Sequence, residues 1–290
     1  MWAVAIHGGA GRVSAASIDT DCRVMDEAVT WAQGELDRGA AALDVVEGAI
    51  RILEDSGTFV AGKGSSPNIE GEWELDASIC DGATRRCGAV AAMSSVYPPI
   101  SIARAVMERT SHVLLAGAGA AAFARSCGFA EITDPATFFT PRFNPRPKSE
   151  DRHGTVGAVV LDTRGSIAAG TSTGGITGKM RGRVGDSPIV GAGSWADEMV
   201  GVSCTGAGEF FLRTAAAHAV SVRRSLLALP LRSAIDATLA DVAKLGGQGG
   251  MIAIDRDGDV RYGFNSEAIR IGIANSSGLR DIRVARAAQD

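Results

Sequence analysis

The sequence predicts an α+β fold in which layered sheets are covered by helices, and three observations lead to this prediction. Of its 290 residues, 46% are apolar, which is enough to bury a sizeable core. Strand-like segments face each other across turn signals such as Asp81-Gly82 and Asp257-Gly258, as in antiparallel hairpins. Helical patterns come in runs and do not alternate with the strands, which argues against a parallel βα fold.

The first third of the chain predicts a strand, two helices and a hairpin. The apolar segment 2–6 should form a short buried strand that ends at the glycine-rich stretch 7–11. Two helices should follow, and a glycine- and serine-rich loop over 57–68 should lead to strands at 75–80 and 87–93. Apolar residues three and four apart mark one face of the second helix: Leu43, Val46, Ile50 and Leu53.

The rest of the chain predicts more helices and two further hairpins. A helix near 99–109 should precede a strand at 113–116 and another helix. A hairpin is expected from 155–162 and 167–173, with strand-like pieces continuing to Cys204. Two helices should fill 207–245, and a last hairpin should join 251–255 to 260–264.

The segment 140–154 interrupts this pattern. It holds three prolines, six charged residues and one large apolar side chain, Phe143. Such a composition cannot bury enough surface to offset its ordering entropy, so it predicts a flexible linker. Long loops of this kind either join domains or carry function.

Composition and charge exclude several classes of function. The chain has 29 basic and 33 acidic residues and no basic run, which speaks against a nucleic-acid partner. No stretch of about 20 apolar residues and no signal-peptide pattern is present, so we expect a cytoplasmic protein with no membrane contact. The five cysteines are scattered and the four histidines form no HExxH motif, so we expect no catalytic metal site.

Two glycine-rich motifs suggest other functions and are set aside. Residues 117–122 (GAGAAA) match a loose dinucleotide fingerprint, as in an oxidoreductase, but no acidic residue ends a second parallel strand about 20 residues later. We expect these glycines to serve close packing of a helix on a strand. Residues 174–179 (GGITGK) resemble a phosphate loop, but Thr173 stands where glycine is needed and Met180 where serine or threonine is needed.

The junction Gly154-Thr155, where the linker meets a strand, carries the most specific chemistry. Gly154 lets the preceding peptide adopt strained geometry at low cost. The Thr155 hydroxyl could then attack the carbonyl before it, which turns the amide into an ester that water cleaves. The freed α-amine, with a reference pKa of about 7.7–8.0, could act as the base for the same residue's hydroxyl. An isolated Gly-Thr pair is more often an ordinary strand start, so the surrounding residues decide.

Several blocks in order resemble the plant-type asparaginase and isoaspartyl peptidase family of N-terminal-nucleophile hydrolases. The three main blocks are 153–158 (HGTVGA), 171–175 (TSTGG) and 182–188 (GRVGDSP). Further blocks are 7–11 (HGGAG), 61–64, 75–78, 203–209, 246–250 and 264–265. The similarity extends over nearly the whole chain. It implies a four-layer αββα sandwich, one domain over 1–290 built from the segments 1–154 and 155–290.

The resemblance also implies roles for individual residues. Thr155 would be the nucleophile, freed by cleavage after Gly154, and Thr173 would orient its hydroxyl. Arg183 would hold the substrate's α-carboxylate, for which a guanidinium fork is suited, and Asp186 its α-ammonium. Thr205 and the Gly206 amide would stabilise the oxyanion, and Gly208 would let the backbone approach the substrate. A surface ion pair between Arg183 and Asp186, three residues apart, is the alternative for those two.

The implied activity is hydrolysis of β-aspartyl dipeptides, and of L-asparagine, by a homodimer of cleaved subunits. The only cofactor implied is a structural sodium ion near residues 57–66. Val60 departs from the family, which usually has asparagine there close to the nucleophile, and this bears on substrate preference. Two alternatives stay open: a glycosylasparaginase-like amidase, and an inactive, uncleaved relative that acts as a binding protein.

Overall fold

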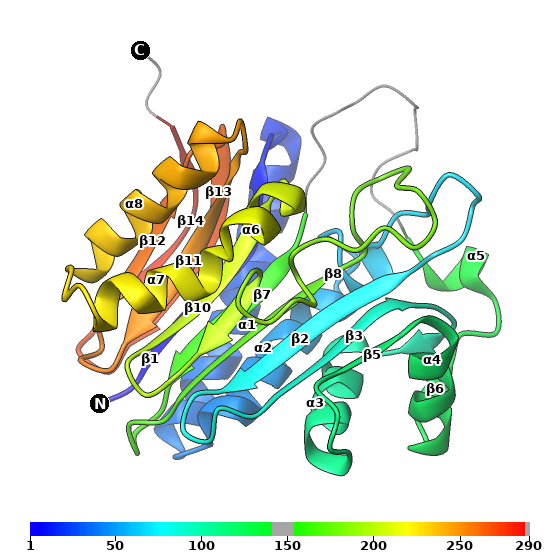
Figure 1. The fold of residues 1–290 in the computed structure, drawn as a ribbon, viewed down its shortest axis with the longest axis horizontal. Coiled ribbons are helices and arrows are strands. Elements are labelled where there is room, and N and C mark those ends of the chain that lie inside the picture. Colours follow the sequence, from blue (N-terminus) through cyan, green and yellow to red (C-terminus); the bar gives the residue numbers. More distant parts are fainter. Residues whose placement is uncertain (141–153, 288–290) are drawn as a thin grey trace.

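The computed structural model describes residues 1–140 and 154–287. Eight α-helices lie in these ranges, so the chain is a mixed α/β protein (Figure 1). They are α1 (Ile18–Asp37), α2 (Ala42–Asp55), α3 (Pro99–Arg109), α4 (Gly117–Ser126), α5 (Pro135–Phe138), α6 (Gly208–Thr214), α7 (Ala216–Ser225) and α8 (Leu231–Lys244). None of the helices in the described ranges combines the length and the hydrophobicity that a bilayer crossing requires.

The strands form one large and two smaller sheets. The large sheet has the order β14-β13-β1-β7-β8-β2-β3-β5, and the second β12-β11-β10-β9. The bounds of the large sheet are β1 (Ala3–Gly11), β2 (Leu75–Asp81), β3 (Cys87–Met93), β5 (Leu114–Ala116), β7 (Val156–Leu161), β8 (Ile167–Thr173), β13 (Ala268–Asn275) and β14 (Arg280–Arg286). Those of the others are β9 (Ser194–Ala196), β10 (Val200–Gly206), β11 (Gly249–Asp255), β12 (Val260–Phe264), and the short pair β4 (Val96–Tyr97) and β6 (Ala130–Glu131).

The central strands of the large sheet are buried on both faces, which explains their continuous apolar runs. Side chains alternate between faces along a strand. Val4 and Ile6 of β1 therefore enter a core cluster with α1, α2 and α3, while Ala3 and Ala5 enter a cluster with β11 of the second sheet. A third cluster joins the second sheet to α7 and α8, which Figure 1 shows at the opposite side from α1 and α2.

Strand β1 is longer than the sequence predicts, and this brings it to the Gly154-Thr155 junction. The prediction that the glycines of 7–11 end the strand is wrong, because pairing with β13 resumes at Ala10 after an irregularity following His7. Gly9 within this irregularity has φ +100°, a conformation that side-chain-bearing residues rarely adopt. A Cβ at Gly9 would lie 3.1 Å from Gly154 Cα, so the two glycine backbones touch.

Three further expectations need correction. Three helices, not two, follow Gly206, because Ala215 adopts the left-handed conformation (φ 45°) and separates α6 from α7. The strands β13 and β14 were not anticipated. The expected packing role of the glycines in 117–122 is wrong: a Cβ at Gly117 or Gly119 would meet nothing within 4 Å, and the helix packs through its alanines.

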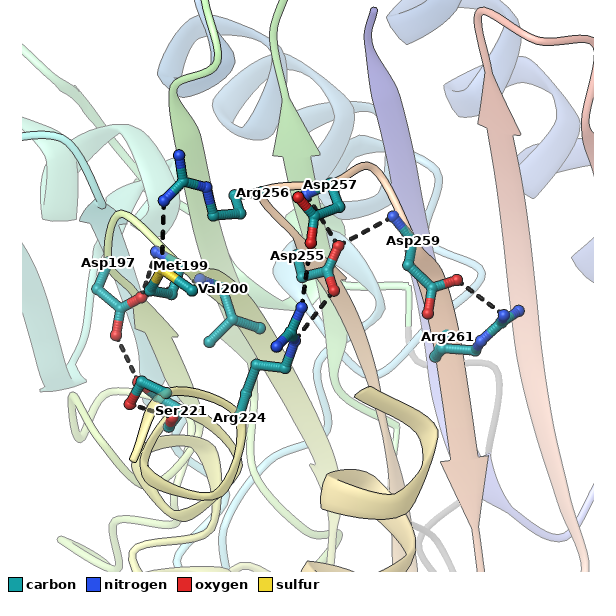
Figure 2. A network of polar contacts seen from close by, with 11 residues as sticks. Asp197, Met199, Val200, Ser221, Arg224, Asp255, Arg256, Asp257, Asp259 and Arg261 are labelled. Atoms are coloured by element: carbon teal, nitrogen blue, oxygen red, sulfur yellow. Dashed lines mark hydrogen bonds and ion pairs between the residues drawn. The ribbon is translucent and has the colours of Figure 1, made fainter. Parts of the chain in front are cut away.

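Strand-end carboxylates anchor the hairpin turns of the second sheet to helix α7 (Figure 2). Asp197 accepts the backbone N–H groups of Met199 and Val200 at 2.8 and 2.9 Å and also the Ser221 hydroxyl of α7. Asp255 accepts the backbone N–H groups of residues 257 and 259 at 3.0 Å each. It also pairs with Arg224 of α7 at 3.1 Å. One carboxylate thus closes each turn and ties it to the covering helix.

Candidate active site

Thr155 stands directly before β7, where the ends of three neighbouring strands of the large sheet meet. Strand β7 lies between β1 and β8, so Thr155 has His7 on one side and Thr173 on the other. Only 6% of Thr155 is exposed. Its hydroxyl donates to Thr173 Oγ1 at 3.4 Å. The geometry therefore gives the Thr155 hydroxyl hydrogen a direction.

His7 holds the Thr155 carbonyl from the other side. Its Nδ1 lies 3.2 Å from Thr155 O and its Nε2 2.9 Å from Ser203 Oγ. Burial lowers the pKa of His7 to about 3, against the smaller raising effect of the bond to Thr155, so the ring is neutral near pH 7. Nδ1–H is then the donor to the carbonyl and Nε2 accepts from Ser203. A Cβ at Gly157 would lie 2.0 Å from Ser203 Oγ, so glycine leaves room for this contact.

Thr173 is fixed by the loop that carries Val60. Its Oγ1 donates to the Val60 carbonyl at 3.3 Å and accepts the Gly175 N–H at 3.0 Å. The same carbonyl accepts the Gly174 N–H at 2.9 Å. Thr173 Oγ1 therefore has one donor, the Gly175 N–H, and one acceptor, the Val60 carbonyl, on its far side and can receive the Thr155 hydroxyl in one orientation.

The Val60 side chain lies against the residue that precedes the nucleophile. Val60 is 4% exposed, and a Cβ at Gly154 would lie 2.6 Å from Val60 Cγ2. Glycine is thus required at 154 for steric reasons, in addition to its conformational freedom. The position where this chain departs from the family pattern is in contact with the predicted cleavage site.

A small pocket brings most of the predicted residues together. Its wall includes the junction, the end of β8, the turn before the 182–188 block and the end of β10, namely Gly154, Thr155, Thr173, Gly175, Ile176, Arg183, Gly185, Asp186, Ser187 and Gly206. Two predicted residues are not part of this wall. Thr205 lies behind it and its Oγ1 accepts the Ala10 N–H at 3.3 Å. Gly208 packs against Asp186, whose backbone nitrogen would lie 2.9 Å from a Cβ at 208.

Arg183 and Asp186 are arranged differently from the surface pair considered above. The Nε and Nη2 atoms of Arg183 donate to the two carboxylate oxygens of Glu209, each at 2.9 Å. Arg183 is the more buried partner, with 16% of its side chain exposed against 54% for Glu209. Asp186 is therefore the carboxylate that lines the pocket with Thr155, while the Arg183 guanidinium pairs with Glu209.

Asp186 is a buried carboxylate whose hydrogen-bonding capacity is incompletely used. It is 3% exposed, and its Oδ2 has no hydrogen-bond partner in the described part of the chain. Burial raises its pKa to about 7, opposed by its backbone hydrogen bond and by the charge of Arg183. A buried carboxylate with an open hydrogen-bonding position at the wall of a pocket is suited to bind a cationic group.

Comparison with known proteins identifies the family. The family model described as "Asparaginase" matches residues 1–146 and 143–284. An isoaspartyl peptidase of Salmonella typhimurium is 42% identical, over 92% of this chain and 93% of its own length. The isoaspartyl peptidase of Escherichia coli is 41% identical, over 92% and 90%. A plant-type L-asparaginase of Pyrococcus abyssi is 41% identical, over 92% and 94%.

The chain belongs to the asparaginase family. The resemblance seen in the sequence is thereby confirmed. Within this asparaginase-family chain, the junction at Thr155, the hydroxyl of Thr173 and the charged pair at 183 and 186 lie around one pocket. Their roles stay predictions. The greater part of the predicted linker, 141–153, lies outside the described residues.

Sequence reasoning did not single out two buried polar residues beside this pocket, Asp76 next to Thr173 and Lys179 next to Gly175. Asp76 is paired in register with Thr173, its Oδ2 has no partner among the residues described, and burial raises its pKa to about 6. Lys179 is buried, with Nζ donating to the Glu74 carbonyl at 3.2 Å. Asp76 belongs to the family block 75–78, and Lys179 belongs to the motif 174–179 that was set aside as a phosphate loop. No local pattern shows that a lysine or an aspartate in such a block is buried, because burial depends on distant strands.

Proposed function

We propose that this asparaginase-family chain is a self-cleaving amidohydrolase that uses Thr155 to hydrolyse β-aspartyl dipeptides and, less well, L-asparagine. The observation that carries the proposal is the pocket lined by Thr155, Arg183 and Asp186, in which Asp186 Oδ2 has no hydrogen-bond partner among the described residues. A zwitterionic aspartyl head fits this set of charges. The relatives named isoaspartyl peptidase and plant-type L-asparaginase support the same substrate class.

Maturation comes first in this proposal. Thr155 Oγ1 attacks the Gly154 carbonyl carbon, the C–N bond between the two residues breaks, and an ester links Gly154 to the Thr155 side chain. Water then hydrolyses the ester, which leaves a carboxylate on Gly154 and a free amine on Thr155. Gly9 and Val60, which contact Gly154, support this step by confining the peptide.

The mature enzyme would repeat the same chemistry on its substrate. The neutral Thr155 amine takes the hydroxyl proton as Oγ1 attacks the side-chain carbonyl of the aspartyl unit. The Thr205 hydroxyl and the Gly206 N–H stabilise the oxyanion. The proton passes to the leaving nitrogen, ammonia or an amino acid departs, and water cleaves the acyl-enzyme to release aspartate.

Recognition of the aspartyl head would use both charged residues. The ion pair with Glu209 occupies Nε and Nη2 of Arg183, so we assign Nη1 to the substrate α-carboxylate. The Asp186 carboxylate takes the α-ammonium and gains the partner it lacks. Gly208, by packing on Asp186, keeps that carboxylate at the wall of the pocket.

We further propose the architecture and assembly that go with this function. Three of the core clusters, which lie between the two sheets and between each sheet and its helices, support a four-layer αββα sandwich, made as one domain from the segments 1–154 and 155–290. The cleaved subunits would form a homodimer, as the family resemblance implies. Light scattering after size exclusion should give the mass of four fragments, and the mass of a single cleaved chain would contradict the dimer.

A structural sodium ion near the loop 57–66 is also proposed. Hard cations take oxygen ligands. Two buried oxygens in or beside this loop, Ser65 Oγ and Glu54 Oε2, have no hydrogen-bond partner among the described residues. The melting temperature should be higher in sodium chloride than in choline chloride of equal ionic strength. Equal melting temperatures would argue against the ion.

The proposed substrate is tested by the Arg183→Ala variant. Losing a charge-assisted hydrogen bond costs about 1.5–3 kcal/mol, so kcat/KM for β-Asp-Leu should fall roughly 10–150-fold. Self-cleavage should continue, because it does not involve a free α-carboxylate. The wild type should cleave β-Asp-Leu but not α-Asp-Leu. Unchanged kcat/KM in Arg183→Ala would remove Arg183 from the site, and no hydrolysis of any β-aspartyl compound would reject the function.

A further inference from the structure

A second, larger cleft adjoins the pocket at Thr155. It has a volume of about 540 Å³, within the usual range for small-molecule sites. The cleft is lined by the end of β1, the residue after β10, the loop before β11 and the segment before β13, namely Ala10, Gly11, Arg12, Ala207, Gly246, Gln248, Gly249, Asn265, Ser266 and Glu267.

The end of β10, which holds the proposed oxyanion donors, borders both cavities. Gly206 faces the pocket at Thr155, and the next residue, Ala207, lines the second cleft. Ala207 N–H donates to the Gln248 carbonyl at 2.9 Å, and the Thr205 hydroxyl accepts the Ala10 N–H at 3.3 Å. The proposed oxyanion donors are therefore adjacent to residues that line the second cleft.

Strand β1 connects the second cleft to the reacting atoms. Gly9 touches Gly154, and a Cβ at Gly9 would lie 3.5 Å from the Thr155 nitrogen. The next three residues, Ala10, Gly11 and Arg12, line the cleft. When the aspartyl head occupies the first pocket, Thr155 and the oxyanion donors take two further directions around the attacked carbon. The leaving nitrogen takes the remaining direction, and the second cleft beyond β1 offers space for what is attached to it.

The chemistry of the cleft suits an amino acid with a free carboxylate. Its walls are mainly backbone, glycine and small polar groups, which make little demand on the shape of a side chain. Its charged residues are Arg12 and Glu267, with Arg12 Nε 3.6 Å from a Glu267 oxygen. Their side chains are 73% and 55% exposed, and exposed ion pairs of this kind are weak. A substrate carboxylate can therefore replace Glu267 at the Nε edge of the Arg12 guanidinium.

We propose that this cleft is the leaving-group subsite and that Arg12 binds the α-carboxylate of the departing amino acid. The inference rests on the proposed function and names the part of the substrate that the first pocket does not recognise. A β-aspartyl dipeptide with a free C-terminal carboxylate fills both cavities. L-asparagine fills only the first, because its leaving group is ammonia.

The test compares β-Asp-Leu with β-Asp-leucinamide, which differ only in the terminal carboxylate, using L-asparagine as the reference. An exposed charge-assisted contact predicts about 3–10-fold higher kcat/KM for the free acid in the wild type, mainly through KM. Arg12→Gln should bring the two dipeptides to the same kcat/KM. Glu267→Gln, which removes the competing carboxylate, should increase the preference for the acid. Arg23→Gln, an exposed arginine on α1, is the matched control and should keep the wild-type ratio.

The outcomes separate the subsite from the function. An acid-to-amide ratio near one in the wild type, or a ratio that Arg12→Gln leaves unchanged, would overturn the subsite while the proposed function stands. Loss of the preference in the Arg23→Gln control would show a general charge effect and would also overturn it. If the wild type hydrolyses no β-aspartyl compound at all, the proposed function fails and the subsite fails with it.

Discussion

At the scale of single residues, three glycines around Thr155 are set by contacts that a side chain would block. Gly154 touches Val60, Gly157 leaves space for the bond between His7 and Ser203, and Gly9 touches Gly154. The sequence predicts the first from the chemistry of self-cleavage. It cannot predict the second, because His7 and Ser203 are 196 residues apart and meet only through the packing of β1 against β10.

Val60 is the residue at which substrate preference is most open to change. Valine offers no side-chain hydrogen bond, and its side chain lies against Gly154. L-Asparagine has no second residue through which binding could be recovered, so the wild type should prefer isoaspartyl dipeptides. Val60→Asn should raise kcat/KM for asparagine roughly 2–10-fold, the effect of about one neutral hydrogen bond. The measurement is the ratio of kcat/KM for the two substrates in both proteins.

Two results would contradict this prediction. One is a wild type that already prefers asparagine. The other is a ratio that Val60→Asn leaves unmoved, which would mean that Val60 only packs against the loop and Gly154.

Asp186 should control the acid limb of the pH profile. Its pKa is raised to about 7, and only the ionised form can bind the substrate α-ammonium. The Thr155 amine must also be deprotonated, with a reference pKa of about 7.7–8.0. Both requirements make kcat/KM rise with pH, so below pH 7 the slope of log kcat/KM against pH should approach two. In Asp186→Asn the slope should be one, and a slope that stays at two would remove Asp186 from the account.

The raised pKa of Asp186 also affects stability, which should fall with rising pH while kcat/KM rises. The folded pKa lies above the ordinary 3.8, so the stability linked to Asp186 is fully present below pH 3.8 and is lost as pH rises through about 7. Asp186→Asn should therefore gain more in melting temperature at pH 8 than at pH 5. Equal gains at both values would show that the buried carboxylate is not the cause.

At the scale of elements, one device closes several hairpins. A strand-end Asp or Asn accepts backbone N–H groups of its own turn at Asp162, Asp197, Asp255 and Asn275. The turn dipeptide at 257–258 was predictable, since Asp-Gly is a standard signal. The anchoring of Asp197 to Ser221 was not predictable, because that contact depends on the position of α7 (Figure 2).

Among these strand-end residues, Asp197 should contribute the most to stability. Burial alone would raise its pKa, but hydrogen bonds from Ser221, Trp195 and two backbone N–H groups outweigh that effect and hold the pKa below 3.8. Asp197→Asn should cost about 1.5–3 kcal/mol at pH 7, or roughly 3–10 °C in melting temperature. Because the folded pKa is lowered, this stability is present above pH 3.8 and is lost as pH falls through the folded value.

A matched control and the pH series make this prediction sharp. Asp257→Asn changes a carboxylate that is 70% exposed and paired with Arg224, and it should shift the melting temperature by less than about 1 °C. The difference between wild type and Asp197→Asn should shrink below about pH 4. A difference that is constant from pH 7 to pH 3 would attribute the loss to shape and not to charge.

At the scale of the whole molecule, the fold class was predictable and the edge of the large sheet was not. Strands buried on both faces have continuous apolar runs that stand out in the sequence, as β7 does. The edge strand β14 is mostly half-buried or exposed and carries Arg280, Arg283 and Arg286, so it has no clear alternation. The pocket residues were named from the family blocks, while the pairing of Arg183 with Glu209 required the structure, because 26 residues separate them.

The central claim is that the chain cuts itself before Thr155, and denaturing mass spectrometry of the purified protein tests it most directly. The 29.8 kDa chain should appear as two fragments, the smaller of which begins Thr-Val-Gly-Ala, while Thr155→Ala should stay in one piece. A wild-type chain that remains intact and still hydrolyses β-aspartyl dipeptides would contradict the account.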